Sequence, residues 1–359
     1  MSGSDILVAA ACVGAAFLIG PALFRAAWWA IGKRKLRAAG SRPLSATTHR
    51  LWSEPRPIEQ RDPVAGPGGP EGVPRPPFVF VEEHLTGSQP CISVRDSRNR
   101  VWRAKWGPEA RSEAFAVRFA WSCGYFVEET HFVPAGTIDG SPVLTRAREC
   151  VDEANGRFCD ARFELDDPTV KKLFEEHSWA WDENPFVGSR ELNGLKIVVM
   201  LLSNWDTKDR RDVARGSNTA IFEHRHGGRR EARYLISDWG GSMGRWGSTM
   251  VTRGRWDPDG FEAQTPGFVT GVVDGHVRFG YAGQRADIAD AIPVEHVRWL
   301  HPYLAQLTPD YLTRALLASG ATDEEAARFS RALVDRIRQL GEVCATERPY
   351  AAEELADPA

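Results

Sequence analysis

Apolar and polar residues alternate along the chain with two different periods, which divide it into a strand-rich part followed by a helix-rich part. From residue 78 to 106 the side chains alternate over short runs, as in Val101-Trp102-Arg103-Ala104-Lys105-Trp106. A period of two predicts strands. It also places Lys105 on the opposite face of its strand from Trp102 and Trp106.

A helix is predicted directly after these strands. It opens at Pro108, a residue favoured in the first turn of a helix, and stops at Gly124. Glu113 lies on this helix. Phe126–Val133 and Pro142–Arg146 then predict two more strands.

The strongest helical signal lies near the middle of the chain. Residues Glu191 to Leu202 are apolar nearly all round, which predicts a buried helix. A polar loop follows at once, and the buried helix should hold it in place. Its acidic and amide residues are Asn204, Asp206, Asp209, Asp212 and Asn218.

A predicted hairpin follows this loop. Its strands are Thr219–Glu223 and Ala232–Ser237, around a turn that contains Gly227-Gly228, and it ends in Asp238-Trp239-Gly240-Gly241. Carboxylates at the ends of a helix and a hairpin suit a divalent metal bound to phosphate. Magnesium usually binds one or two carboxylates together with substrate phosphates.

Composition excludes several classes of protein. With 42% hydrophobic and 26% charged residues, the 359-residue chain can form a sizeable core. A net charge of −3 gives no argument for a nucleic-acid partner. The six cysteines form no CxxC pair, which favours free thiols over zinc or a disulfide framework.

The N-terminal region predicts a membrane anchor. No charged residue occurs from Leu7 to Phe24, and about 18–20 apolar residues suffice to span a bilayer. We therefore expect a transmembrane helix at 6–31. Basic residues follow it, so the positive-inside rule predicts a single-pass cell-membrane protein with its N-terminus outside and its domain cytoplasmic. The alternative is a cleaved signal peptide. Residues 32–77, basic and then rich in proline and glycine, are expected to be a linker.

The order of these features resembles the protein-kinase-like fold. A strand lysine precedes a helix glutamate; later a buried helix ends in Asn-x-Asp, and a hairpin ends in Asp-x-Gly. The chain is most similar to atypical members of the HipA toxin-kinase and phosphatidylinositol-kinase type, which have an Asn-x-Asp loop and lack the His-Arg-Asp triplet. The resemblance covers roughly residues 78 to 244.

The resemblance implies a role for each matching residue. Lys105 would hold nucleotide phosphates and pair with Glu113, while Asp206 would orient or deprotonate the acceptor. Asp238 would hold the metal. Asn218 would be the second metal ligand, with Asp209 as its rival. Gly87 and Ser88, in the turn that replaces a glycine-rich loop, would contact the nucleotide. The implied co-substrate is ATP and the implied metal Mg²⁺ or Mn²⁺.

The sequence departs from the family pattern at three places. Asn218 lies farther from Asp206 than the usual motif allows, the turn at Gly87 lacks the G-x-G-x-x-G pattern, and the interval from Lys105 to Glu113 is short. Lys105 and Glu113 alone could be a surface ion pair, the loop at Asp206 a solvated loop, and Asp238-Trp-Gly-Gly a simple turn. His224 and His226 have metal-ligand spacing, but the arginines around them favour a solvated hairpin tip.

The expected architecture is therefore an α+β, two-lobed kinase-like domain after an N-terminal transmembrane helix. Its β-rich N-lobe would span 78–148 and its mainly helical C-lobe 149–345, with a tail at 346–359. The expected activity is ATP- and metal-dependent phosphotransfer to a hydroxyl of a protein, lipid or small molecule at the membrane. Alternatives are a pseudokinase-like module that binds nucleotide or partners and a metal-dependent phosphohydrolase.

Overall fold

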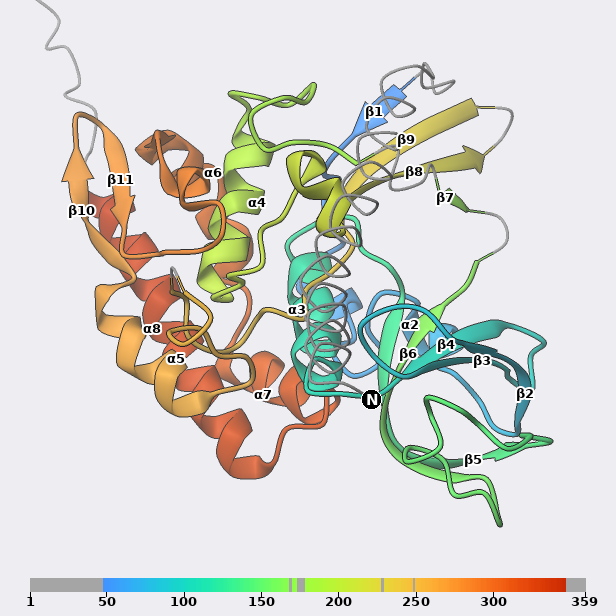
Figure 1. Cartoon of the computed structure of the whole chain (residues 1–359). Helices are drawn as coiled ribbons and strands as arrows, with labels where there is room; N and C mark the ends of the chain where they lie inside the picture. The colour runs from blue at the N-terminus through green and yellow to red at the C-terminus, as the bar shows by residue number, and fades with distance from the viewer. Residues whose placement is uncertain (1–47, 168–169, 173–177, 227–228, 248, 347–359) are drawn as a thin grey trace, which may run out of the picture.

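The computed structural model describes residues 48–346, apart from 168–169, 173–177, 227–228 and 248. The fold is α+β: five strands form a barrel at one end, while most helices gather at the other (Figure 1). The interior of the barrel and the helical part have separate hydrophobic cores.

The barrel is closed and has the strand order β2-β3-β4-β6-β5. Its strands are β2 (Phe78–His84), β3 (Cys91–Arg95), β4 (Val101–Lys105), β5 (Thr130–Asp139) and β6 (Arg157–Leu165). A short parallel pairing of Phe78 with Ile138 closes it. Trp102 and Ala104 point into the core, whereas Lys105 is partly exposed on the other face. The alternation predicted for β4 is confirmed.

The predicted strand at Pro142–Arg146 is wrong, because this stretch is a loop. The carboxylate of Glu83 accepts hydrogen bonds from the amides of Thr145, Arg146 and Ala147, at 2.8, 2.7 and 2.9 Å. These amides are thus satisfied without a neighbouring strand. The last strand of the barrel is β6 instead, so the barrel continues beyond residue 148, where the N-lobe was expected to end.

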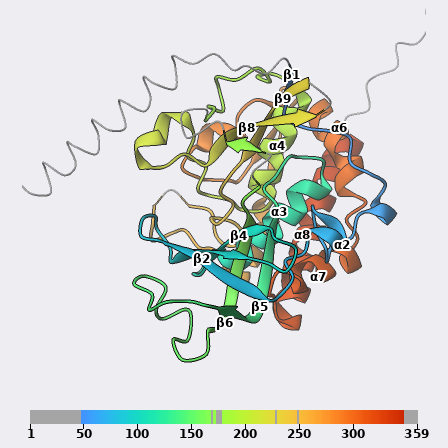
Figure 2. The ribbon, with the colours of Figure 1, turned by 90° about the vertical axis from the view of Figure 1, so that its right-hand side faces the viewer.

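Helix α3 (Ala110–Ser122) lies between the barrel and the helical part in both views (Figures 1 and 2). Its apolar side chains, among them Phe115 and Phe119, belong to the larger core. Its first turn lies beside the loops that carry the predicted site residues. Helix α3 therefore contacts both the helical core and the loops of the predicted site.

The remaining strands form two small sheets. The first has the order β1-β9-β8-β7, with β1 (Thr48–Arg50), β7 (Lys171–Lys172), β8 (Thr219–His226) and β9 (Arg229–Ile236). The predicted hairpin is β8 and β9, which pair from Thr219–Ile236 to His226–Arg229. The second has the order β10-β11-β12, with β10 (Val269–Val273), β11 (His276–Phe279) and β12 (Ile292–Pro293).

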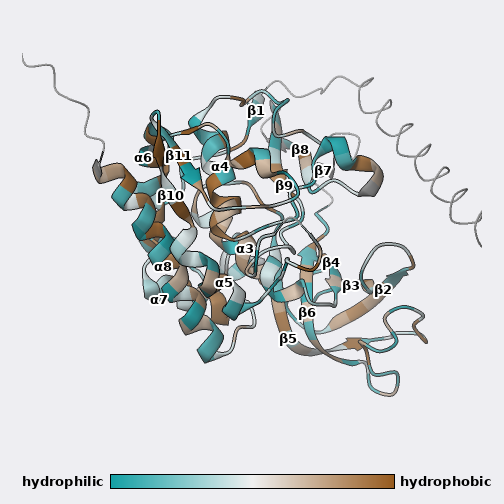
Figure 3. Cartoon of the chain, turned by 60° about the vertical axis from the view of Figure 1, so that its left-hand side comes forward, coloured by the Kyte–Doolittle hydropathy of each residue, from teal (hydrophilic) through white to brown (hydrophobic). Residues whose placement is uncertain are grey.

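Helix α4 (Arg190–Leu201) confirms the predicted buried helix. The Ser189 hydroxyl accepts a hydrogen bond from the Leu192 amide and caps its start. The other helices are α5 (Pro258–Gln264), α6 (Val294–Leu304), α7 (Pro309–Leu317) and α8 (Asp323–Thr346), with short 3₁₀ turns η3 (Arg210–Arg215), η4 (Thr265–Gly267) and η5 (Ala286–Ala289). Bands of hydrophobic and hydrophilic residues alternate along α8, as expected for a helix with one buried face (Figure 3).

The expected linker is packed against the domain over residues 48–77, which include η1 (Ile58–Gln60) and α2 (Gly69–Gly72). Leu51 is buried in the larger core. The Trp52 indole donates to the Cys123 carbonyl at 2.7 Å, and the Arg61 guanidinium contacts the Ser122 carbonyl. The carbonyls at the end of a helix lack partners within it. Residues 48–77 therefore supply hydrogen-bond donors to the carbonyls at the end of α3. The composition of the segment did not reveal this role.

The expected transmembrane helix, residues 6–31, lies outside the described residues. In the part of the chain that the structure describes, no helix is both long and apolar enough to cross a membrane. The longest, α8, has 24 residues but carries charged side chains along its exposed face. The fold that the structure describes is therefore α+β, and none of its described helices supports the expected single-pass membrane span.

Candidate functional site

The polar loop after α4 is fixed at its base by a buried arginine. The Arg336 guanidinium, from α8, donates to the Leu201 carbonyl and the Ser203 hydroxyl, both at 2.8 Å. Ser203 adopts a left-handed conformation (φ 54°), which ends the helix and turns the chain. The residues that follow are thus held by the core.

Asp206 is enclosed but poorly partnered. Its side chain is 15% exposed, and Oδ2 lies 3.3 Å from the Lys208 ammonium. The other oxygen, Oδ1, is buried and has no hydrogen-bond partner among the described residues. Burial raises the pKa of Asp206 and the nearby Asp238 adds to the rise, whereas Lys208 and the side-chain amide of Asn218 oppose it.

Two glycines bring the Asp238 turn against the Asp206 loop. The Gly240 amide donates to Asp238 Oδ1 at 2.9 Å. A Cβ on Gly241 would lie 2.8 Å from Asn204 Oδ1 and 2.9 Å from Asp206 Cβ. Only glycine allows so close an approach. Asp206 and Asp238, which come from separate loops, therefore lie near each other.

Glu109 is a third acidic residue of this site, and the sequence did not single it out. It precedes the first turn of α3, where a Cβ on Gly240 would lie 2.8 Å from its Cγ. Burial raises the pKa of Glu109, as does Asp238, while Arg255 and Arg162 oppose the rise. Glu109, Asp206 and Asp238 are called the carboxylate cluster below. No sequence motif marks Glu109, because it joins the cluster through the packing of α3.

The two candidates for a second metal ligand differ in their surroundings. Asn218 is buried beside Asp206 and donates from Nδ2 to the Asp206 carbonyl at 2.6 Å. Asp209 is fully buried, accepts from the Trp181 amide at 3.2 Å and from Arg211 Nε at 2.9 Å, and caps η3. Its oxygens are thus committed to the fold. Asn218 is the better candidate, and Asp209 has a structural role.

Lys105 and Glu113 do not form the pair that the resemblance implies. Lys105 Nζ lies 3.0 Å from Glu164 Oε2, whereas the Glu113 carboxylate contacts the Arg162 guanidinium. Arg162 also lies 3.3 Å from Glu164. Both new partners are on β6, the strand that the sequence analysis missed. These four residues form a line of alternating charges, Lys105–Glu164–Arg162–Glu113, called the barrel ion-pair line below.

Gly87 and Ser88 lie in the exposed turn between β2 and β3. Gly87 has a positive φ of 105°, and its carbonyl accepts a hydrogen bond from Arg146 at 2.9 Å. Through Arg146 this turn is joined to the loop that Glu83 organises. These contacts give the turn a defined conformation but do not connect it to the carboxylate cluster.

The carboxylate cluster offers oxygen atoms of the kind that bind a metal ion. Within the described ranges, no three His, Cys, Asp or Glu side chains come close enough together to hold one ion. Magnesium, however, needs only one or two carboxylates when phosphates and water complete its shell. The buried, unpartnered Oδ1 of Asp206 and the raised pKa values of Asp206 and Glu109 are features that a bound cation would relieve. Asp238 and Asn218, with Asp206 beside them, offer the kind of oxygen ligands that magnesium takes when phosphate completes its shell.

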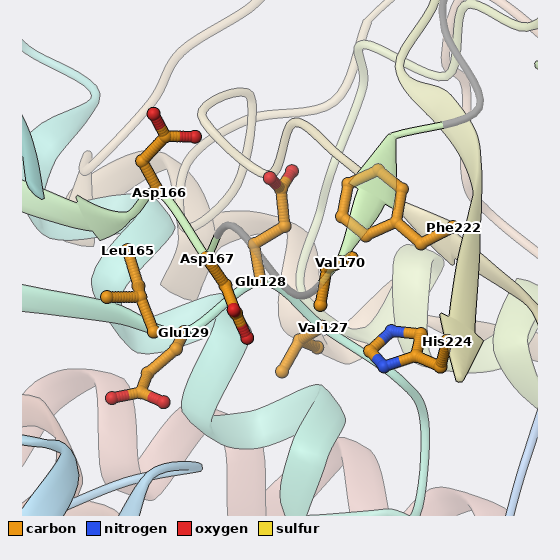
Figure 4. A pocket seen from close by; sticks show the side chains of 9 residues that line it. All are labelled: Val127, Glu128, Glu129, Leu165, Asp166, Asp167, Val170, Phe222 and His224. Carbon is orange, nitrogen blue, oxygen red and sulfur yellow. The ribbon is translucent and has the colours of Figure 1, made fainter. Parts of the chain in front are cut away.

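A separate cavity of about 160 Å³ lies where β6 leaves the barrel (Figure 4). The acidic residues Glu128, Glu129, Asp166 and Asp167 line it together with apolar side chains and His224. None of the predicted site residues is among its lining residues. This cavity is therefore distinct from the carboxylate cluster.

Comparisons of this chain with protein-family models, with curated proteins and with solved structures found no match.

Proposed function

We propose that the chain is a magnesium-dependent phosphotransferase that moves the γ-phosphoryl group of ATP to a hydroxyl. The observation that carries the proposal is the proximity of Asp206 and Asp238, from separate loops, with Asp206 Oδ1 left without a hydrogen-bond partner among the described residues. The order of elements adds support, since a strand-rich barrel precedes a buried helix, an Asn-x-Asp loop and a hairpin that ends in Asp-x-Gly.

Asp206 is suited to receive the proton of the acceptor hydroxyl. The acceptor oxygen forms a bond to the γ-phosphorus, the bond from that phosphorus to the β,γ-bridging oxygen breaks, and ADP leaves with the electron pair. The acceptor proton passes to the Asp206 carboxylate. A raised pKa makes this carboxylate a better proton acceptor than an ordinary aspartate.

Asp238 and Asn218 would hold the magnesium ion, which would supply positive charge to the phosphate oxygens as the transferred group departs. Lys208, 3.3 Å from Asp206, favours the charged form of that carboxylate and orients it. The fold contributes mainly position and electrostatics, which is how most catalysis of phosphoryl transfer is achieved.

Nucleotide turnover by the full chain tests the proposal. With magnesium present, we expect ATP to bind and ADP to form slowly even without an added acceptor, because water can replace the hydroxyl. With EDTA, ADP formation should stop. If the protein binds no nucleotide, the proposal fails. Hydrolysis of p-nitrophenyl phosphate faster than of ATP would instead identify a phosphohydrolase.

A further inference from the structure

The barrel ion-pair line holds two cations that could reach a phosphate, and their surroundings differ. Lys105 and Arg162 are direct cross-strand partners on β4 and β6, so both side chains lie on one face of the barrel wall. The side chain of Lys105 is 30% exposed, whereas that of Arg162 is 8% exposed and lies between Glu113 and Glu164. The two cations therefore differ in burial: Arg162 is enclosed between two carboxylates, whereas Lys105 is partly exposed at the end of the line.

Arg162 is at the end of the line nearer the carboxylate cluster. It contacts Glu113, which follows Glu109 by one turn of α3. Residues four apart lie on one helix face with a rise of about 6 Å. Burial and Asp238 raise the pKa of Glu109, and Arg162 is among the cations that oppose them, consistent with this short separation. Asp238 and Arg162 thus both lie close to Glu109, at the same end of α3.

Lys105 is engaged at the other end. Its ammonium lies 3.0 Å from Glu164, which is also 3.9 Å from Arg103. Lys105 and Arg103 therefore both neutralise Glu164. Glu113 is the principal counter-ion of Arg162. A guanidinium has five donors in a planar fork, so it can retain Glu113 while it donates to phosphate oxygens.

We propose that Arg162 on β6, oriented by Glu113 on α3, is the phosphate-binding cation of this site, in place of Lys105 on β4. This inference rests on the proposed nucleotide-dependent function and names the residue that would bind the phosphates. The helix glutamate keeps the role that the family resemblance implies, but its cationic partner comes from the neighbouring strand.

Calorimetric titration of the full chain with MgATP tests the assignment. Arg162→Met should weaken MgATP binding by about 10- to 100-fold, the range expected for lost hydrogen bonds to a charged group. Lys105→Met removes the same charge from the partner position and should change binding by no more than about threefold, because the Lys105 ammonium is already paired with Glu164 and its partly exposed charge is screened by solvent. Adenosine, which has no phosphate, should bind all these proteins alike.

Arg162→Lys keeps the test usable if the methionine variant unfolds, as judged by thermal melting. Lysine retains the charge but not the fork, so MgATP affinity should fall by about 3- to 10-fold, whereas Lys105→Arg should leave it unchanged. Loss of binding in Lys105→Met with Arg162 variants unaffected would overturn the assignment. Failure of the wild-type protein to bind MgATP would overturn the proposed function itself, and the assignment with it.

Discussion

The loop after α4 holds two aspartates, Asp206 and Asp209, in opposite situations. Within the part of the chain that the structure describes, one oxygen of Asp206 has no hydrogen-bond partner, and the residue lies near the carboxylates of Asp238 and Glu109. Asp209, three positions later, accepts hydrogen bonds from two backbone amides and from Arg211. Burial of a charge is costly unless it is fully partnered. The comparison teaches that the under-partnered aspartate is the one available for ligand chemistry, whereas the saturated one maintains the fold.

The largest expected effect is on turnover when the under-partnered aspartate is neutralised. Asp206→Asn should reduce MgATP turnover by about 10²- to 10⁴-fold, the usual contribution of a general base. Its stability should change little, because the substitution removes a carboxylate from an already acidic cluster. The control is Asp182→Asn, an exposed carboxylate paired with Arg211 at 2.8 Å. Equal turnover by the two variants would contradict a role for Asp206 in the reaction.

Removal of the saturated aspartate should instead affect folding. Asp209→Ala removes the acceptor of the buried Trp181 amide and the buried carboxylate that pairs with Arg211, so the free energy of unfolding should fall by about 3–5 kcal/mol. Urea denaturation of this variant beside Asp206→Ala measures the contrast. If Asp206→Ala is the less stable of the two, the structural and functional roles have been assigned the wrong way round.

Displacement of the loop should have an intermediate effect. A methyl group on Gly241 would lie within 3 Å of Asn204 and Asp206. Gly241→Ala should therefore lower turnover by about 10- to 100-fold, as small misplacements of reacting groups do. Gly267→Ala is the matched control, because a Cβ there meets nothing within 4 Å. The steady-state turnover of the two folded variants is the measurement that tests this prediction. Equal values would show that the close approach of Gly241 to Asp206 has no functional importance.

The smallest effect concerns pH. Burial and neighbouring carboxylates raise the pKa values of Asp206 and Glu109 above their ordinary 3.8 and 4.5. Between the ordinary and the raised values, the folded state binds more protons than the unfolded state, so stability falls as pH rises through that window. Asp206→Asn combined with Glu109→Gln should lose less stability over the same range. Urea midpoints at several pH values measure how stability depends on pH in the wild-type protein and in the double variant. An equal pH dependence in the two proteins would show that the Asp206 and Glu109 carboxyls do not cause it.

Local pattern was enough to predict the element that delivers the site. The apolar run of α4 marks a buried helix whatever its neighbours are, so the loop that follows was expected at its end. The alternation along β4 likewise fixed the face of Lys105. These features depend on periods within one segment, which a sequence displays directly.

Features that depend on partners from distant segments were not predictable. The sequence predicted the last strand of this region at Pro142–Arg146, whereas the last barrel strand is β6, at Arg157–Leu165. The pairing of Lys105 with Glu164, which lies on β6, could therefore not be predicted. Asp206 and Asp209 are the same residue type in one loop, and only the arrival of Trp181 and Arg211 distinguishes them. Residues 48–77 have the composition of a tether, yet they cap α3 through Arg61 and Trp52.

The central claim is that Asp238 holds a metal–nucleotide complex beside Asp206. Calorimetric titration of ATP into the wild-type chain and into Asp238→Ala, each with and without magnesium, tests it most directly. We predict magnesium-dependent ATP binding by the wild-type protein, and loss of that dependence in an Asp238→Ala variant that retains its melting temperature. ATP binding that is equal in both proteins and unaffected by magnesium would contradict the claim.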